Sequence, residues 1–107
     1  MLQLNSNLSR YGVFSTIDDM LANDLKEQGL PDAPGVYIFR DTKGNILYIG
    51  KATSLRDRVR SYFANDLLHT RGKHIVDMVT LAQAVTYTET DSVLEAVILE
   101  AAMIKQH

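Results

Sequence analysis

The chain contains no cysteine and no tryptophan, and only two of its 107 residues are proline. Without cysteine it cannot form a disulfide, a thiolate metal site or a thiol nucleophile. No apolar run approaches the roughly 18 residues that a membrane-spanning helix needs, and the first ten residues lack the apolar core of a signal peptide. These absences lead us to expect a soluble, cytoplasmic domain with no membrane association.

What the chain does have is the composition of an ordinary globular domain, with 46% hydrophobic and 22% charged residues. Its length fits one domain. The net charge of −2 hides an uneven distribution, because six cations and only two aspartates lie between Lys51 and Lys73, which gives this block about +4. Such a block is either a solvated helix face or a surface that faces a polyanion such as DNA.

Hydrophobic periodicity and capping residues predict a mixed order of helices and strands. Ser15 and Ser92 are each followed three residues later by an acidic residue, which is typical of a helix start, and Ser54 can cap a further helix. The expected elements are a loose arm over 1–14, a helix over 15–29, strands over 36–39 and 46–49, helices over 55–63 and 71–82, a strand over 85–90 and a helix over 92–104. This order predicts an α+β domain in which helices flank a small antiparallel sheet.

Glu100 is the most unusual polar residue, because its expected helix surrounds it with apolar side chains. The positions three and four residues away are Ala96, Val97, Met103 and Ile104. A carboxylate in such a setting is partly desolvated, so it needs a cationic partner, a proton or a bound cation. It is either half of a structural ion pair with an arginine or a ligand for a hard divalent cation.

Arg58 shares one face of its expected helix with Leu55, Val59 and Tyr62. An arginine on this inward side is expected to meet an anion, such as Glu100 or a phosphate. The alternative is that its stem simply lies along the edge of the core.

Three tyrosines lie in this part of the chain. Tyr37 and Tyr48 are on the strands expected over 36–39 and 46–49, which are predicted to form a β-hairpin around a turn over 41–45, and Tyr62 is on the following helix. Tyrosines on strands commonly serve packing alone. Here, however, Tyr48 is followed by Gly50, which permits close approach of the backbone, and by Lys51, which places a cation at the strand end. The tyrosines are therefore candidates for chemistry as well as for packing.

These residues form a pattern that resembles a known family. Gly35-Val36-Tyr37 and, after ten intervening residues, Tyr48-Ile49-Gly50 are similar to the two signature triplets of the GIY-YIG nucleases. The segments 34–39, 47–52, 55–63 and 96–105 resemble the N-terminal nuclease domain of the UvrC family of excinucleases. The resemblance covers residues 31–105, and it divides the chain into an N-terminal arm and helix over 1–30 and a GIY-YIG endonuclease domain over 31–107.

The resemblance implies a GIY-YIG nuclease fold with three antiparallel strands and a metal-dependent DNA endonuclease. The family cuts the damaged strand on the 3′ side of a lesion in nucleotide excision repair, so damaged duplex DNA and the complex of DNA with UvrB, the helicase-like excinuclease component, are the expected partners. One divalent cation, Mg²⁺ or Mn²⁺, is the expected cofactor. The implied catalytic residues are Tyr37, Tyr48, Lys51, Arg58, Tyr62 and Glu100, with Glu100 as the metal ligand.

Two features depart from the family pattern. Ala102 stands where the family commonly has asparagine. The segment before Pro31 is longer than usual and resembles the extension of a shorter stand-alone homologue that also makes a 3′-side cut, or that of a nuclease domain fused to other modules.

Several alternatives stay open at the level of sequence. Either Tyr37 or Tyr48 could activate water as a general base, with Lys51, Arg58 and the metal favouring the phenolate, or a tyrosine could simply orient the water. DNA is expected to contact the cations of the basic block: Lys51, Arg56, Arg60, Arg71 and Lys73. Rival functions are a restriction or homing endonuclease of the same superfamily, for which residues 1–30 are poor in base-reading side chains, and a catalytically silent DNA-binding module.

Overall fold

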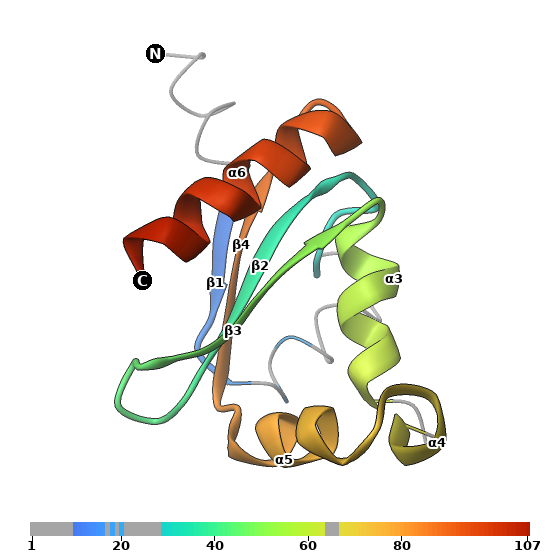
Figure 1. Cartoon of the computed structure of the whole chain (residues 1–107), viewed down its shortest axis with the longest axis vertical. Helices are drawn as coiled ribbons and strands as arrows, with labels where there is room; N and C mark the ends of the chain where they lie inside the picture. The colour runs from blue at the N-terminus through green and yellow to red at the C-terminus, as the bar shows by residue number, and fades with distance from the viewer. Residues whose placement is uncertain (1–9, 17, 19, 21–28, 64–66) are drawn as a thin grey trace.

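The structure, a computed structural model, describes residues 10–16, 18, 20, 29–63 and 67–107 (Figure 1). The elements in this part of the chain are β1 (Tyr11–Phe14), β2 (Gly35–Arg40), β3 (Ile46–Ala52), α3 (Leu55–Arg60), the 3₁₀ helix η1 (Ser61–Phe63), α4 (Leu67–Arg71), α5 (Lys73–Leu81), β4 (Ala84–Glu89) and α6 (Val93–Gln106). The predicted α+β class is confirmed.

The strands form one antiparallel sheet in the order β1-β4-β2-β3. The predicted hairpin is β2 and β3, and its turn is built on Asp41. The Asp41 carboxylate accepts the backbone N–H groups of Lys43 and Asn45, each at 2.9 Å, and Gly44 adopts a φ of 83° that few other residues tolerate. This local chemistry explains why the hairpin could be predicted from sequence.

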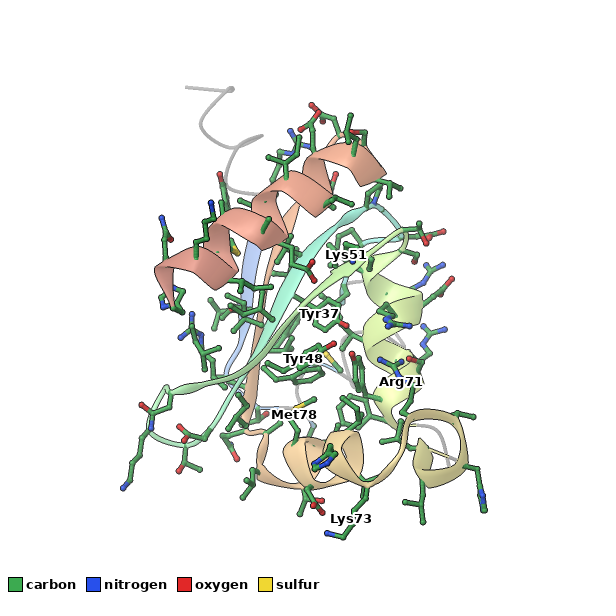
Figure 2. All side chains as sticks on the ribbon, in the orientation of Figure 1. Tyr37, Tyr48, Lys51, Arg71, Lys73 and Met78 are labelled. Atoms are coloured by element: carbon green, nitrogen blue, oxygen red, sulfur yellow. The ribbon has the colours of Figure 1, made fainter. Side chains whose placement is uncertain are left out.

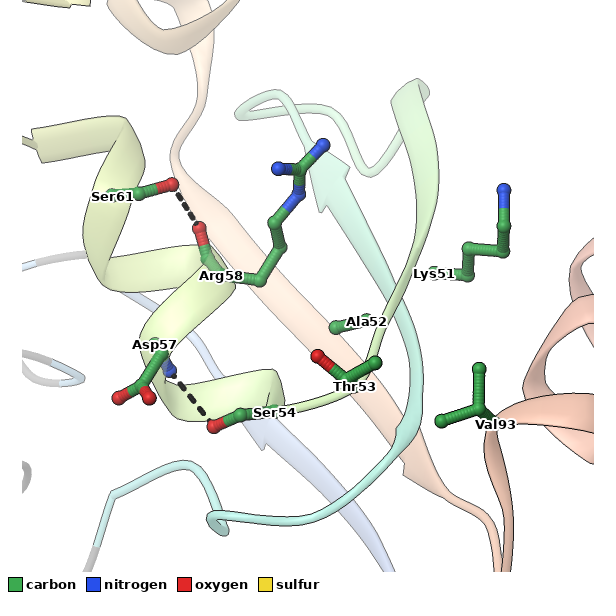
Figure 3. Close-up of a pocket in the computed structure, with 8 residues that line it drawn as sticks. All are labelled: Lys51, Ala52, Thr53, Ser54, Asp57, Arg58, Ser61 and Val93. Carbon is green, nitrogen blue, oxygen red and sulfur yellow. Dashed lines mark hydrogen bonds between the residues drawn. The ribbon is translucent and has the colours of Figure 1, made fainter.

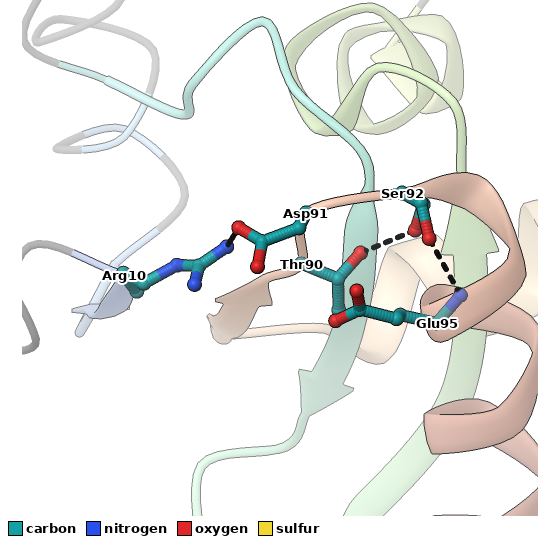
Figure 4. A network of polar contacts seen from close by, with 5 residues as sticks. All are labelled: Arg10, Thr90, Asp91, Ser92 and Glu95. Carbon is teal, nitrogen blue, oxygen red and sulfur yellow. Dashed lines mark hydrogen bonds and ion pairs between the residues drawn. The ribbon is translucent and has the colours of Figure 1, made fainter.

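The first strand corrects two predictions, the loose arm over 1–14 and the sheet of three strands. Tyr11–Phe14 pairs with β4 and makes a fourth strand. Arg10 secures the pairing, because its carbonyl accepts the Glu89 N–H at 2.7 Å and its guanidinium forms an ion pair with Asp91 (Figure 4). The sequence does not predict this strand, because four residues that include a glycine are too few to show an alternation of apolar and polar side chains. The hydrogen-bond partners of β1 come from β4, whose edge would otherwise be open.

Helices cover both faces of the sheet (Figure 1). On one face, α3, η1 and α5 pack over the main hydrophobic core, whereas α6 crosses the other face over β2 and β3. The largest fully buried side chains of the core are Tyr37, Tyr62, Phe39, Leu55, Val36, Val59 and Val85. In the described part of the chain, no helix combines the length and apolarity that a membrane span requires.

Two predicted helices differ in the structure. The helix expected over 55–63 is α3 followed by the tighter turn of η1. The helix expected over 71–82 is α5, which begins only at Lys73, because Gly72 with a φ of 84° separates it from α4, a helix that was not predicted. Periodicity alone does not reveal these breaks, because the apolar spacing continues across them.

The predicted caps of α3 and α6 are confirmed. Ser54 Oγ accepts the Asp57 N–H at 3.2 Å, and Ser92 Oγ accepts the Glu95 N–H at 3.1 Å (Figure 4). The helix predicted over 15–29 lies mostly outside the described residues.

Candidate active site

The glycines of both triplets make room for neighbouring side chains. Tyr37 pairs with Gly50 on the hairpin, and a Cβ at Gly50 would come within 2.3 Å of the Tyr37 ring and hydroxyl. A Cβ at Gly35 would meet the Thr88 carbonyl at 2.3 Å and the Leu55 side chain at 2.6 Å. The Tyr37 ring and α3 therefore approach the sheet closely only because these two positions have no side chain.

Gly50→Ala is expected to destabilise the domain by about 1–3 kcal/mol, because the added methyl displaces a fully buried ring. The measurement is thermal unfolding combined with near-UV circular dichroism, which reports on the packing of the tyrosines. Gly44→Ala is the control, since that turn position has open space and a φ of 83°. It should lower the melting temperature through backbone strain alone and leave the near-UV spectrum unchanged. A wild-type spectrum for Gly50→Ala would contradict the prediction.

Three tyrosines from two strands and η1 form one cluster, of which Figure 2 labels Tyr37 and Tyr48. The hydroxyls of Tyr37 and Tyr62 are 2.6 Å apart and share a hydrogen bond. The ring of Tyr48 lies 6.3 Å from each of the other two rings, measured between centroids. Tyr37 and Tyr62 are buried, at 0% and 1% exposure, whereas Tyr48 is partly exposed. Tyr48 is therefore the member of the cluster that solvent can reach.

The pKa values of two of these phenols are raised in the domain without a cation. Burial raises the pKa of Tyr37, the hydrogen-bonded Tyr62 raises it further, and Arg58 opposes both effects. Burial and Tyr62 also raise the pKa of Tyr48, while the charges of Arg58 and Arg71 lower it. Protein groups alone therefore keep both phenols protonated at neutral pH, so the expected pull of the arginines toward the phenolate is present but is outweighed by burial.

Arg58 lies at the mouth of an open pocket of about 420 Å³ (Figure 3). Its helical neighbours Leu55 and Val59 are fully buried, as expected of the inward stripe, while Arg58 itself stays exposed at the edge of that stripe. The pocket is lined by Lys51, Ala52, Thr53, Ser54, Asp57, Arg58, Ser61 and Val93. Because Lys51 and Arg58 contribute from opposite sides (Figure 3), the pocket presents two cations to any bound anion.

Glu100 extends from α6 toward the same region. Its Oε1 lies 3.5 Å from Lys51 Nζ, and the exposed fractions of the two side chains are 19% and 49%. The partial burial agrees with the expectation from its apolar neighbours, but the partner is Lys51 rather than an arginine. The carboxylate is thus next to the pocket that Arg58 lines.

The residues near Glu100 decide what kind of metal site is feasible. In the described ranges, no three His, Cys, Asp or Glu side chains converge on one point. A cation at this position would have Glu100 as its carboxylate ligand and would take its other ligands from water and substrate oxygens. Mg²⁺ fits such a site, because it keeps several waters and is commonly bound by one or two carboxylates together with phosphate oxygens.

The predicted DNA-contacting cations occupy different settings. Arg56 forms ion pairs with Asp32 at 3.2 Å and with Asp57 at 3.6 Å. Lys73 pairs with Asp77 within α5, but its side chain is 81% exposed, and such a surface pair is weak. Arg71 points into the tyrosine cluster, where its Nη2 donates to Tyr62 Oη at 2.9 Å (Figure 2).

Analysis of the sequence missed some members of this site. Thr53 and Ser61 line the pocket from the two ends of α3, and Arg71 reaches Tyr62 from α4. No local pattern signals these contacts, because each depends on how separate elements pack. The structure thus brings the predicted residues into one region: Lys51 and Arg58 line the pocket, Glu100 lies beside Lys51, and the tyrosine cluster lies beside Arg58.

Comparison with known proteins shows the family to which the chain belongs. Residues 33–107 match the family described as the UvrC-like GIY-YIG domain. UvrABC system protein C from Moorella thermoacetica is 49% identical over 89 residues, which cover 78% of this chain and 13% of the relative. The corresponding protein from Haloarcula marismortui is 43% identical over 93 residues, which cover 82% of this chain and 15% of the relative. The chain therefore matches only a small part of the length of these relatives.

Solved structures of UvrC GIY-YIG domains have a fold similar to that of this chain. The GIY-YIG N-terminal endonuclease domain of UvrC from Thermotoga maritima, bound to magnesium as its catalytic divalent cation, is 38% identical with a TM-score of 0.61 and covers 72% of this chain and 80% of its own. A variant of that domain with one tyrosine changed to phenylalanine, also bound to its catalytic divalent cation, gives a TM-score of 0.63 at 34% identity and covers 79% of this chain and 88% of its own. The chain therefore belongs to the family of UvrC-like GIY-YIG domains.

Proposed function

We propose that this chain is a divalent-cation-dependent endonuclease domain that hydrolyses a DNA phosphodiester bond and makes the 3′-side incision of nucleotide excision repair. One observation carries the proposal. Lys51 and Arg58 line one pocket, with the Glu100 carboxylate beside Lys51 and the tyrosine cluster beside Arg58. This arrangement supplies the three requirements of phosphodiester hydrolysis: a place for a cation, donors for the phosphate and a group that acts on water.

Glu100 would hold the cation, Mg²⁺ or Mn²⁺. When bound, the cation would act as a Lewis acid on the scissile phosphate and the leaving oxygen. In the relative from Thermotoga maritima, domains with a single tyrosine changed to phenylalanine still bind the catalytic cation. This supports the carboxylate, rather than those tyrosines, as the group that holds the metal, and it leaves the tyrosines available to act on water.

Arg58 and Lys51 would bind the scissile phosphate in the pocket between them. The planar guanidinium of Arg58 can donate two hydrogen bonds to phosphate oxygens, and its charge opposes the negative charge that grows in the transition state. Lys51 would exchange its contact with Glu100 for one with the phosphate once a metal neutralises the carboxylate.

Tyr48 is the tyrosine that best fits the role of base. Tyr37 is buried and its hydroxyl is already bonded to Tyr62. Tyr48 is partly exposed, and both Arg58 and Arg71 lower its pKa against the effect of burial. A cation near this phenol would favour its phenolate form, which could then accept the proton of the attacking water, while Tyr37 and Tyr62 hold the cluster in place.

The partners and compartment follow from the same proposal. The substrate would be damaged duplex DNA, presented in a complex with UvrB, and the activity would be cytoplasmic.

The test of the proposed function has two stages. Nicking of supercoiled plasmid is measured with Mg²⁺, with Mn²⁺ and with EDTA, and then incision of a duplex with one defined lesion is measured with UvrB. Nicking that needs the cation and incision 3′ to the lesion support the proposal.

Other outcomes of that test would replace it. Cutting at a fixed base sequence without a lesion would indicate a restriction or homing enzyme. DNA binding without any cut in either cation would indicate a silent binding module.

The exposed cations Arg60 and Lys73 are expected to bind DNA through the phosphate backbone. The affinity for a short duplex should fall with salt, with a log–log slope of about −0.9 for each phosphate contacted. Arg60→Ala and Lys73→Ala should each weaken binding by a few fold and reduce the slope by about one contact. Lys43→Ala, in the hairpin turn away from the pocket, is the control and should change neither. Fluorescence anisotropy in EDTA gives both quantities, and a flat salt response would contradict this prediction.

A further inference from the structure

Arg71 makes two contacts with the same tyrosine. Its Nη2 donates to Tyr62 Oη at 2.9 Å, and its guanidinium carbon lies 4.6 Å from the centre of the Tyr62 ring (Figure 2). Arg71 comes from α4, nine residues after Tyr62 in η1. The side chain therefore joins two helical segments at the edge of the tyrosine cluster.

The hydrogen bond from Arg71 limits the other hydrogen bonds that the Tyr62 hydroxyl can form. A guanidinium only donates, so Arg71 occupies one lone pair of Tyr62 Oη. The 2.6 Å bond between Tyr62 and Tyr37 then uses one hydroxyl hydrogen and one further lone pair. Arg71 and Tyr37 thus hold the Tyr62 hydroxyl together, which restricts its rotation.

The same guanidinium is poorly placed for a second role as a DNA contact. Arg71 is only partly exposed, and a movement toward a phosphate that broke its bond to Tyr62 would remove one hydrogen bond from the hydroxyl of a tyrosine that is only 1% exposed, which is costly. Lys73, two residues later, has no such constraint, because its side chain is 81% exposed and pairs with a surface carboxylate. The two cations are therefore expected to behave differently.

We propose that Arg71 is a positioning residue, which holds the Tyr62 hydroxyl so that the tyrosine pair is fixed beside Tyr48 and Arg58. This inference rests on the proposed nuclease function. Arg71 acts on the rate of the bond-breaking step through Tyr62, and it contributes little to DNA affinity.

The test is a double-mutant cycle on Arg71 and Tyr62, with Lys73→Ala as a contrasting variant that is expected to weaken DNA binding. Single-turnover cleavage at saturating protein and equilibrium affinity for the same DNA in EDTA are measured for Arg71→Ala, Tyr62→Phe and the double variant. We expect Arg71→Ala to slow cleavage by about 10-fold or more, as loss of an orienting partner typically does, with a change in DNA Kd below about twofold. In the Tyr62→Phe background, Arg71→Ala should add little further loss.

Conservative variants keep the test valid if the alanine variant folds poorly. Arg71→Lys keeps the charge and an ammonium donor but loses the planar guanidinium, so it should restore part of the rate, whereas Arg71→Gln is shorter and uncharged and should restore less. Equal and independent losses in the cycle, or a weaker Kd with a shallower salt slope and a normal cleavage rate, would overturn the proposal and make Arg71 a phosphate contact.

A readout without cleavage separates this inference from the proposed function. Tyrosine ¹³Cζ NMR signals report on hydroxyl hydrogen bonding. Arg71→Ala should shift the signals of both Tyr62 and Tyr37, whereas Lys73→Ala should leave them unchanged. An unmoved Tyr37 signal would overturn the positioning role. Failure of the wild type to nick DNA in any cation would overturn the nuclease proposal, and the NMR result would still decide whether Arg71 orders the tyrosine pair.

Discussion

Glu100→Gln is expected to abolish cleavage while leaving the domain folded. Metal-assisted stabilisation of a phosphoryl transition state is worth several kcal/mol, so loss of the carboxylate should slow nicking by at least about 10³-fold. The fold should survive, because the Lys51 partner is half exposed and remains solvated when its counter-charge is removed. Single-turnover nicking, calorimetric titration with Mn²⁺ and thermal unfolding together measure the three consequences.

Glu95→Gln is the matched control for this experiment. Glu95 lies on the same helix, is exposed, and has its backbone N–H bonded to Ser92 at the helix start. Its substitution should leave cation binding and nicking unchanged. If Glu100→Gln instead melts well below the wild type and still cuts DNA, the carboxylate is structural and the assignment of the metal ligand is wrong.

Arg58→Ala is expected to lower the single-turnover cleavage rate by about 10²–10³-fold, which is typical for the loss of one transition-state donor. DNA affinity should change little, because one phosphate contact among several is modest. Arg58→Lys keeps the charge but loses the planar guanidinium, which can donate two hydrogen bonds to a phosphate at once, so it should recover only part of the cleavage rate.

Arg60 offers the contrast for Arg58, because it lies on the same helix and outside the pocket lining. Arg60→Ala should weaken binding while cleavage at saturating protein stays near normal. Arg56 is a poorer control, since its ion pairs with Asp32 and Asp57 tie it to the fold as well. Equal effects of Arg58→Ala and Arg60→Ala on the cleavage rate would mean that α3 is only a basic binding face.

The sequence by itself determined those features that depend on neighbouring residues. The turn at Asp41, the serine caps of α3 and α6, and the buried stripe of Leu55 and Val59 all follow from side chains a few residues apart. Such interactions are local, so their signals survive without knowledge of the rest of the fold. The partial burial of Glu100 was predictable for the same reason, because its apolar neighbours are one helical turn away.

The tertiary structure alone decided the features that join distant elements. β1 becomes a strand only because the edge of β4 offers it hydrogen-bond partners. The partner of Glu100 is Lys51 because α6 crosses β3 at that position, and Arg71 meets Tyr62 because Gly72 ends α4 where it does. Gly50 is needed for the ring of Tyr37 on the neighbouring strand, a contact set by strand register. Periodicity and capping report which face of an element is apolar, whereas the pairing of polar groups across elements depends on packing that no short stretch of sequence encodes.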